Sequence, residues 1–278
     1  MSGVHIVTDS SCDLPEALVV ELGITIVPLT IRFGEEEFVD RRDLTAKEFW
    51  ARCAASPVLP ETAAPSPGAF EAAYRQAAGA GADGVLCLTL SGELSATLQA
   101  AQLAATSVTD VPVQVIDSRS VTMGLGMIVV DAARRAAAGA SLDDVAEGAH
   151  EAVRRTRVYG ALDTLENLKK GGRIGNARAL LGSMLSIKPI VEVRDGRVEE
   201  AGKQRTRAKA LAHLVERVRG AGRISNVAVM HADCPDVDQV VAQVQGLVPD
   251  DVVVGEIGPV IGAHTGRGTI GVVFQQLS

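Results

Sequence analysis

Three hydroxyl-rich segments are the first candidates for chemistry in this sequence. They are Asp-Ser-Ser at 9–11, the stretch 91–95 and Asp-Ser at 117–118. Hydroxyl groups donate hydrogen bonds to an anion. Ser95 stands at a predicted helix start, where serine is most often an N-cap and where free backbone amides favour an anion. Because the sequence contains no Gly-x-Ser-x-Gly and no His-Glu-x-x-His pattern, we expect Ser95 to bind an anion rather than act as a nucleophile.

A glycine-rich basic segment is the second candidate. Residues 168–175 are Leu-Lys-Lys-Gly-Gly-Arg-Ile-Gly. These glycines could turn successive amides towards an anion, with Arg173 adding charge. The segment is not a Walker A sequence, and a glycine helix cap followed by a turn is the simpler interpretation.

His264 is the third candidate. It is surrounded by glycines at 258, 262, 266 and 268, a density typical of tight turns or of close approach to a ligand. An imidazole there could polarise a carboxylate or form a charge pair with it. A structural histidine bonded to the backbone carries equal weight. The other four histidines are expected to be structural.

The first half of the chain predicts a mostly parallel sheet with helices on both faces. Apolar runs at 4–8, 85–90 and 113–116 alternate with helical segments, one of them starting near Ser95. A hairpin is expected over 24–39 and a loop over 56–68. Ligands of open α/β sheets bind beyond the carboxyl ends of the strands. The three hydroxyl-rich segments follow those ends.

The second half predicts a mixed sheet with helices. Strands are expected at 158–162, 226–230, 251–256 and 269–274, with a hairpin over 187–203, helices over 207–219 and 235–247, and a loop over 258–268. The fold class is therefore α/β, with an N-terminal domain at 1–155 and a C-terminal domain at 156–278.

Composition narrows the classes of function. The net charge of −7 argues against nucleic acid as a partner. Residues 154–209 nevertheless hold 14 Lys/Arg against 6 Asp/Glu, which indicates a basic patch or, with equal weight, ordinary solvated faces. The four cysteines form no CxxC pair, and the N-terminus has no signal-peptide pattern. We expect a cytoplasmic protein with no metal and no cofactor.

Six segments in order resemble the DegV family of bacterial fatty-acid-binding proteins. They are Thr-Asp-Ser-Ser (8–11), Thr-x-x-Pro-Ser-Pro-Gly (62–68), Leu-Ser-x-x-Leu-Ser-x-Thr (90–97), Val-Ile-Asp-Ser with Met-Gly-x-Gly (115–126), 168–175 continuing to Leu185–Ile190, and Ile-Gly-Pro-Val-Ile-Gly-Ala-His-Thr-Gly (257–266). One segment alone would be weak evidence. Their common order across nearly the whole chain makes the resemblance specific.

The resemblance implies two α/β domains that bury a long acyl chain, with the fatty acid as ligand. It implies that Ser95 anchors the carboxylate, with Thr62 and the backbone at Ala96 beside it. Arg173 and His264 would belong to the surrounding polar network. A separate fatty acid kinase would make the acyl phosphate, and Arg205 or Arg207 would face that kinase.

Four positions depart from the family pattern: Ala63, Ala64, Ala96 and Leu98. They bear on the chain length or shape preferred and on which kinase is used. Two other classes of function stay open. One is an enzyme acting on a phosphorylated or acyl substrate through Lys169–Arg173 and His264; the other is a regulatory protein with a structural lipid. A transient membrane contact would use the basic stretch, since anionic lipids attract Lys/Arg clusters.

Overall fold

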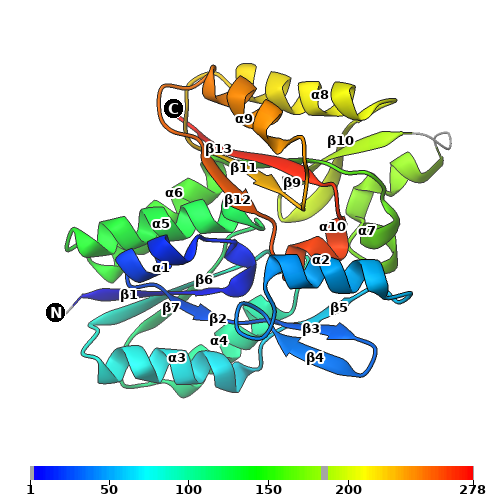
Figure 1. The fold of residues 1–278 in the computed structure, drawn as a ribbon. Helices are drawn as coiled ribbons and strands as arrows, with labels where there is room; N and C mark the ends of the chain where they lie inside the picture. The colour runs from blue at the N-terminus through cyan, green and yellow to red at the C-terminus, as the bar shows by residue number, and fades with distance from the viewer. Residues whose placement is uncertain (1–2, 183–186, 278) are drawn as a thin grey trace.

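The computed structural model describes residues 3–182 and 187–277, in five alternating layers of helices and sheets (Figure 1). The first sheet has the order β2-β1-β6-β7, and all of its strands are parallel. The strands are β1 (Val4–Asp9), β2 (Thr25–Val27), β6 (Gly84–Thr89) and β7 (Val113–Asp117). Every residue of β6 is buried, as expected of a strand covered on both faces.

Helices cover both faces of this sheet. On one face lie α3 (Pro67–Gly79) and α4 (Thr97–Ser107); on the other lie α5 (Met123–Ala137) and α6 (Leu142–Arg155). Helix α1 (Glu16–Glu21) follows a short 3-10 turn, η1 (Ser10–Cys12), at the end of β1. The predicted parallel sheet with helices on both faces is confirmed.

The second sheet is mixed, with the order β10-β9-β8-β13-β11-β12. Only β11 and β12 pair in parallel. Its strands are β8 (Thr156–Ala161), β9 (Lys188–Arg194), β10 (Arg197–Gln204), β11 (Ile224–His231), β12 (Val253–Glu256) and β13 (Ile270–Gln276). Helices α8 (Arg207–Arg219) and α9 (Val237–Gln245) cover its outer face, and α5 and α6 approach its inner face (Figure 1).

Close packing joins the two sheets through α5. A Cβ on Gly124 would lie 2.4 Å from Val158 Cγ2 on β8, and one on Gly126 would lie 2.7 Å from the carbonyl oxygen of Cys12. The Met-Gly-x-Gly motif therefore lets α5 approach both neighbours. One apolar core runs from Ile6 to Val273 across the predicted boundary at residue 155, where α6 meets β8. The division into two domains stays a prediction.

Local structure differs from the sequence predictions in three places. Residues 24–33 do not form one strand: β2 joins the parallel sheet, whereas β3 (Thr30–Phe33) pairs with β4 (Glu36–Val39) in a small third sheet. The predicted loop 56–68 contains the third strand of that sheet, β5 (Glu61–Ala63), and α2 (Ala46–Ala55) precedes it. The predicted loop 258–268 contains α10 (Pro259–Thr265). Gly258 and Pro259 start this helix, so the glycine density concealed it.

Candidate functional site

A mostly apolar cavity lies between the six-stranded sheet and the loops at the carboxyl ends of the parallel strands. Its volume is about 190 Å³. Its apolar lining comes from both halves of the chain: Leu29, Leu90, Leu94, Val121, Val158, Leu162, Leu168, Val191, Val193, Val198, Ile257, Val260 and Ile261. Five of the predicted site residues line the same cavity: Thr62, Ser95, Ala96, Arg173 and His264.

Thr62 and His264 are joined directly, although 202 positions separate them in the sequence. Thr62 Oγ1 lies 2.8 Å from His264 Nε2. Strand β5 carries Thr62 and pairs with β3 at Ile31, while α10 carries His264. The sequence does not predict this contact, because it indicates a loop where the structure has β5.

His264 is neutral at pH 7. Burial, with a smaller repulsion from Arg173, lowers the pKa of its imidazole from 6.5 to about 4. Its Nδ1 is buried and has no hydrogen-bond partner among the described residues. Of the two roles considered for this histidine, the lowered pKa favours polarisation of a ligand by a neutral ring over a charge pair.

The packing around His264 explains why the glycine-rich segment has a glycine at position 171. A Cβ at this position would lie 2.5 Å from His264 Nδ1, so only glycine allows the imidazole to approach. Gly175 has φ +50 and would place a Cβ 2.3 Å from the carbonyl oxygen of Val198. Both glycines therefore serve close packing, in a turn between α7 (Glu166–Lys170) and the 3-10 helix η2 (Gly175–Gly182).

Arg173 brings a positive charge to this end of the cavity. Its Nε donates to the carbonyl oxygen of Leu94 at 3.0 Å, and its Nη1 donates to that of Gly171 at 2.6 Å. These partners carry no formal charge, so the guanidinium charge is not neutralised within the site. The bond to Leu94 also ties the basic turn to the loop that carries Ser95.

Ser95 does not cap α4, contrary to the sequence prediction. The helix begins two residues later, its N-cap is Ala96, and no side chain caps it. Ser95 Oγ lies 2.8 Å from Thr97 Oγ1 and accepts the N–H of Thr97 at 3.3 Å. The backbone N–H of Ser95 donates to Ser91, which turns the loop before the helix.

Three other threonine hydroxyls in the lining are bonded to the protein. Thr122 donates to Asp13 at 2.5 Å, Thr265 to the carbonyl of Ile261 at 3.1 Å, and Thr269 to the carbonyl of Gly266 at 2.9 Å. The polar end of the cavity is therefore the cluster Thr62, Ser95, Arg173 and His264. The sequence did not predict that the carbonyl of Leu94 belongs to it or that Gly171 leaves room for His264.

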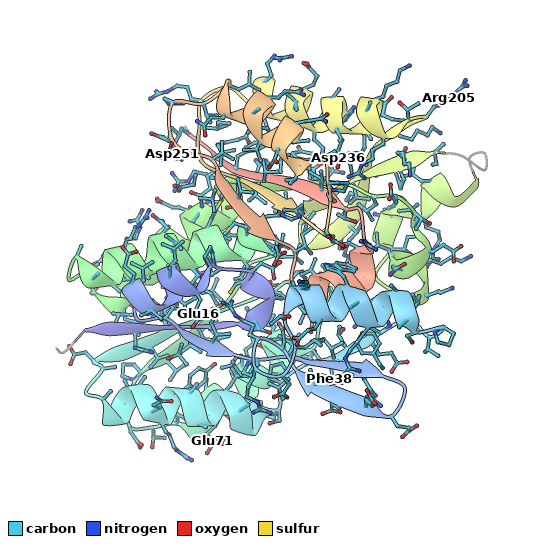
Figure 2. The ribbon with its side chains drawn as sticks, in the orientation of Figure 1. Glu16, Phe38, Glu71, Arg205, Asp236 and Asp251 are labelled. Atoms are coloured by element: carbon cyan, nitrogen blue, oxygen red, sulfur yellow. The ribbon has the colours of Figure 1, made fainter. Side chains whose placement is uncertain are left out.

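Arg205 and Arg207 lie outside this cluster and differ from one another. Arg205 is exposed, at the periphery of the molecule before α8 (Figure 2). Arg207 is half-buried, with bonds of 2.5 and 2.7 Å to the carboxylate of Asp236, and its Nη1 donates to Gly268 at 2.6 Å. The carboxylate of Asp236 therefore neutralises the charge of Arg207 within the fold.

A second, open pocket adjoins the polar end. It has a volume of about 580 Å³ and shares Leu94, Arg173 and Val198 with the cavity. Arg178 and Arg197 also line it. Arg197 pairs with Glu93 at 3.0 Å. Arg173 therefore borders both the cavity and this open, basic pocket.

No helix within residues 3–182 and 187–277 is long and apolar enough to cross a membrane. Across the same residues, no group of three or more His, Cys, Asp or Glu side chains could hold a metal ion. Of the sequence motif Leu185–Ile190, residues 185 and 186 lie outside the described residues.

Fold and cavity define an α/β protein with a mostly apolar cavity between its six-stranded sheet and the loops of its parallel sheet. A family model described as "Uncharacterised protein, DegV family" matches residues 3–277. The chain therefore belongs to the DegV family. A DegV domain-containing protein of Streptomyces coelicolor is 40% identical over 278 residues, which cover 97% of each chain.

Solved structures agree with this assignment. A DegV family protein from Thermus thermophilus, described by its fatty acid binding, is 35% identical with a TM-score of 0.92, over 99% of this chain and 100% of that one. DegV of Bacillus subtilis, described as a fatty acid binding protein, is 27% identical with a TM-score of 0.90, over 100% of both chains. A stearic acid-binding protein from Eubacterium ventriosum is 26% identical with a TM-score of 0.88, over 99% of this chain and 98% of that one.

Proposed function

We propose that this protein binds a long-chain fatty acid, with its tail in the apolar cavity and its carboxylate at Thr62, Ser95, Arg173 and His264. The observation that carries the proposal is the asymmetry of the cavity. Outside these four residues the lining is mostly apolar. The relatives from Thermus thermophilus, Bacillus subtilis and Eubacterium ventriosum, each described as binding fatty acids, support the same ligand class.

Physical chemistry matches each part of the ligand to a part of the site. Each methylene removed from water contributes about 0.8 kcal/mol, so a long tail gives affinity. A carboxylate is costly to bury without partners. The hydroxyls of Thr62 and Ser95 and the charge of Arg173 supply donors, and the backbone at Ala96, the N-cap of an uncapped helix, lies beside them.

The departures from the family pattern divide into two groups. Ala64 and Ala96 line the cavity, so their small side chains bear on the shape of ligand that fits. Ala63 and Leu98 are not among the lining residues. A Cβ on Gly92 would lie 2.6 Å from Leu98 Cδ2, so Leu98 instead packs under the loop before Ser95.

The protein would act as a carrier that presents the carboxylate to a separate fatty acid kinase. The basic pocket supports this part of the proposal, because it is open to the surface and Arg173 lines both it and the cavity. The kinase would contact the surface that includes Arg205. Five exposed cations of the basic stretch have no salt bridge among the described residues: Lys169, Arg178, Lys203, Arg205 and Lys209. A transient membrane contact would use the same groups.

Native mass spectrometry of the purified protein, followed by identification of the released molecule, tests the ligand. A stoichiometric fatty acid is expected. Ser95→Ala should lower retention of that fatty acid about tenfold, the effect of losing one hydrogen bond to a charged group. Ser107→Ala, at the exposed far end of the same helix, is the matched control. No lipid after incubation with palmitate and stearate, or equal retention by the two variants, would contradict the proposal.

A further inference from the structure

The segment Asp9–Asp13 lies outside the lining of the cavity. It contains most of the Thr-Asp-Ser-Ser motif and leaves β1 through η1 at the carboxyl end of the parallel sheet. Both of its aspartates direct their carboxyl groups to other elements of the fold. The elements that they hold are the two that carry Ser95 and His264.

Asp9 holds the start of the loop that carries Ser95. Its Oδ2 accepts the backbone N–H of Leu90 at 2.7 Å, and its Oδ1 accepts the N–H of Ser11 at 3.0 Å and the hydroxyl of Ser11 at 2.5 Å. Leu90 lines the cavity and is the residue immediately before the loop 91–96. Asp9 is fully buried, so water does not compete for these bonds.

Asp13 holds the start of the helix that carries His264. Its Oδ1 accepts the backbone N–H of Gly258, the N-cap of α10, at 3.1 Å. A Cβ on Gly258 would lie 2.5 Å from that oxygen, so the contact depends on glycine. The position of α10 in turn determines where the imidazole of His264 meets Thr62.

Asp13 also secures a strained residue of the cavity wall. Its Oδ2 lies 2.5 Å from Thr122 Oγ1. Thr122 has φ +48 and ψ −142, a conformation that is unfavourable for a β-branched residue and persists only where the surroundings impose it. Asp13 therefore joins α10 to Thr122, the N-cap of α5, and both α10 and Thr122 line the cavity.

We propose that Asp9 and Asp13 are positioning residues that together brace the polar end of the cavity, Asp9 through the Ser95 loop and Asp13 through α10 and Thr122. Neither residue is among those lining the cavity, so both act through other groups. The inference rests on the proposed function only for the identity of the ligand. The bracing itself can be measured without any ligand.

The two aspartates differ in the partners that they need, and this difference makes the inference testable. Burial raises the pKa of Asp13 to about 8. One of its partners is an N–H group, that of Gly258, and the other is the hydroxyl of Thr122, which can donate or accept. In Asp13→Asn, the amide oxygen could accept from Gly258 while the amide NH2 donates to the hydroxyl of Thr122. This substitution should therefore preserve both contacts.

Asp9 should not tolerate the same change. Its two oxygens accept backbone N–H groups of Leu90 and Ser11, which cannot act as acceptors. An asparagine would face one of those N–H groups with its own NH2, whichever way the amide is turned. Burial raises the pKa of Asp9 only to about 6, so the carboxylate is the main form at pH 7.

The experiment combines hydrogen exchange of the ligand-free protein with palmitate titration of Asp13→Ala, Asp13→Asn, Asp9→Asn and the exposed control Asp110→Asn. Asp13→Ala should speed amide exchange in 257–265 and raise the Kd for palmitate about tenfold or more. Asp13→Asn should match wild type in both measurements. Asp9→Asn should speed exchange in 90–97 and weaken binding to a similar degree.

The outcomes separate this inference from the proposed function. If wild type binds no palmitate while the exchange pattern appears as described, the ligand is wrong and the brace stands. If wild type binds palmitate and all four variants match it in affinity and exchange, the brace is overturned. Should Asp13→Ala fail to fold, the contrast between Asp13→Asn and Asp9→Asn decides, and equal behaviour of those two variants would also overturn the inference.

Discussion

Two half-buried arginines of the basic stretch, Arg173 and Arg207, show how differently one charge can be used. Arg173 donates to two backbone carbonyls and keeps its charge. Arg207 is paired with the carboxylate of Asp236 and lies 3.4 Å from that of Asp163. A neutralised arginine supports the fold, whereas an arginine with uncharged partners is available to an anionic ligand. Membership of a basic stretch does not distinguish the two.

The largest expected effect in this comparison is on stability. Arg207→Met removes the cation that contacts the carboxylates of both Asp236 and Asp163. It also removes the hydrogen bond to the carbonyl of Gly268, which precedes the cavity residue Thr269. For a pair that is half-buried, we expect a loss of about 2 kcal/mol in the free energy of unfolding. Chemical denaturation measures it.

A matched control is available on the same part of the protein. Arg267 pairs with Asp233, but both side chains are largely exposed, at 61% and 49%. Arg267→Met should therefore change the free energy of unfolding by less than about 0.5 kcal/mol. Equal losses from Arg207→Met and Arg267→Met would show that Arg207 is not a structural residue.

The second effect is on ligand affinity. Arg173→Gln keeps a donor near Leu94 but removes the charge, so the Kd for palmitate should rise about tenfold. The free energy of unfolding should fall by about 1 kcal/mol or less, because the lost partners are two carbonyls. Isothermal titration and denaturation of the same samples give both values. A large loss of stability with unchanged affinity would reverse the roles assigned to Arg173 and Arg207.

Much of this arrangement follows from local sequence signals, and the rest does not. Strand runs such as 85–90 and the hairpin around Asp195-Gly196 were predicted because their signals are local. The contact of Thr62 with His264 was not, because it needs β5 and α10, two short elements within segments dominated by proline or glycine. The sequence favours Ser95 as an N-cap because serine is common at that position, but α4 starts at Thr97.

The family pattern and the residue patterns contributed differently to the site. From the residues alone, Ser95, Arg173 and His264 were candidates, each with a plausible structural alternative. Their convergence on one cavity is a property of the tertiary structure. The acidic partners of Arg207 lie at positions 163 and 236. Because both are distant from residue 207 in the sequence, the sequence does not show that the charge of Arg207 is neutralised.

The third effect concerns pH and His264, whose ring lies beside the charge of Arg173. Because folding lowers the pKa of His264 from 6.5 to about 4, the unfolded chain binds more protons in that range, and stability is lost as pH falls from 6.5 towards 4. His264→Gln does not titrate. Relative to that variant, wild type should lose about 1 kcal/mol between pH 7 and pH 5.5.

Palmitate should reduce this pH effect, because a nearby carboxylate favours the protonated imidazole. Denaturation of wild type and His264→Gln at both pH values, with and without palmitate, measures the difference. A difference that is independent of pH would mean that His264 has an ordinary pKa in the folded protein. A pH effect that palmitate leaves unchanged would place the carboxylate away from the imidazole.

The smallest expected effect comes from a third arginine of the basic stretch, Arg205, which should affect neither stability nor ligand affinity but only binding of a partner protein. Arg205 is exposed and forms no ion pair with any described residue, so Arg205→Ala should change neither the free energy of unfolding nor the Kd for palmitate beyond about 0.3 kcal/mol. Its expected deficit appears only when a fatty acid kinase is present, as slower formation of acyl phosphate from the loaded protein. Arg219→Ala, another exposed arginine at the far end of α8, is the control. If Arg205→Ala and Arg219→Ala support the kinase equally well, the partner contacts a different surface, and the basic pocket at Arg178 and Arg197 becomes the next place to search.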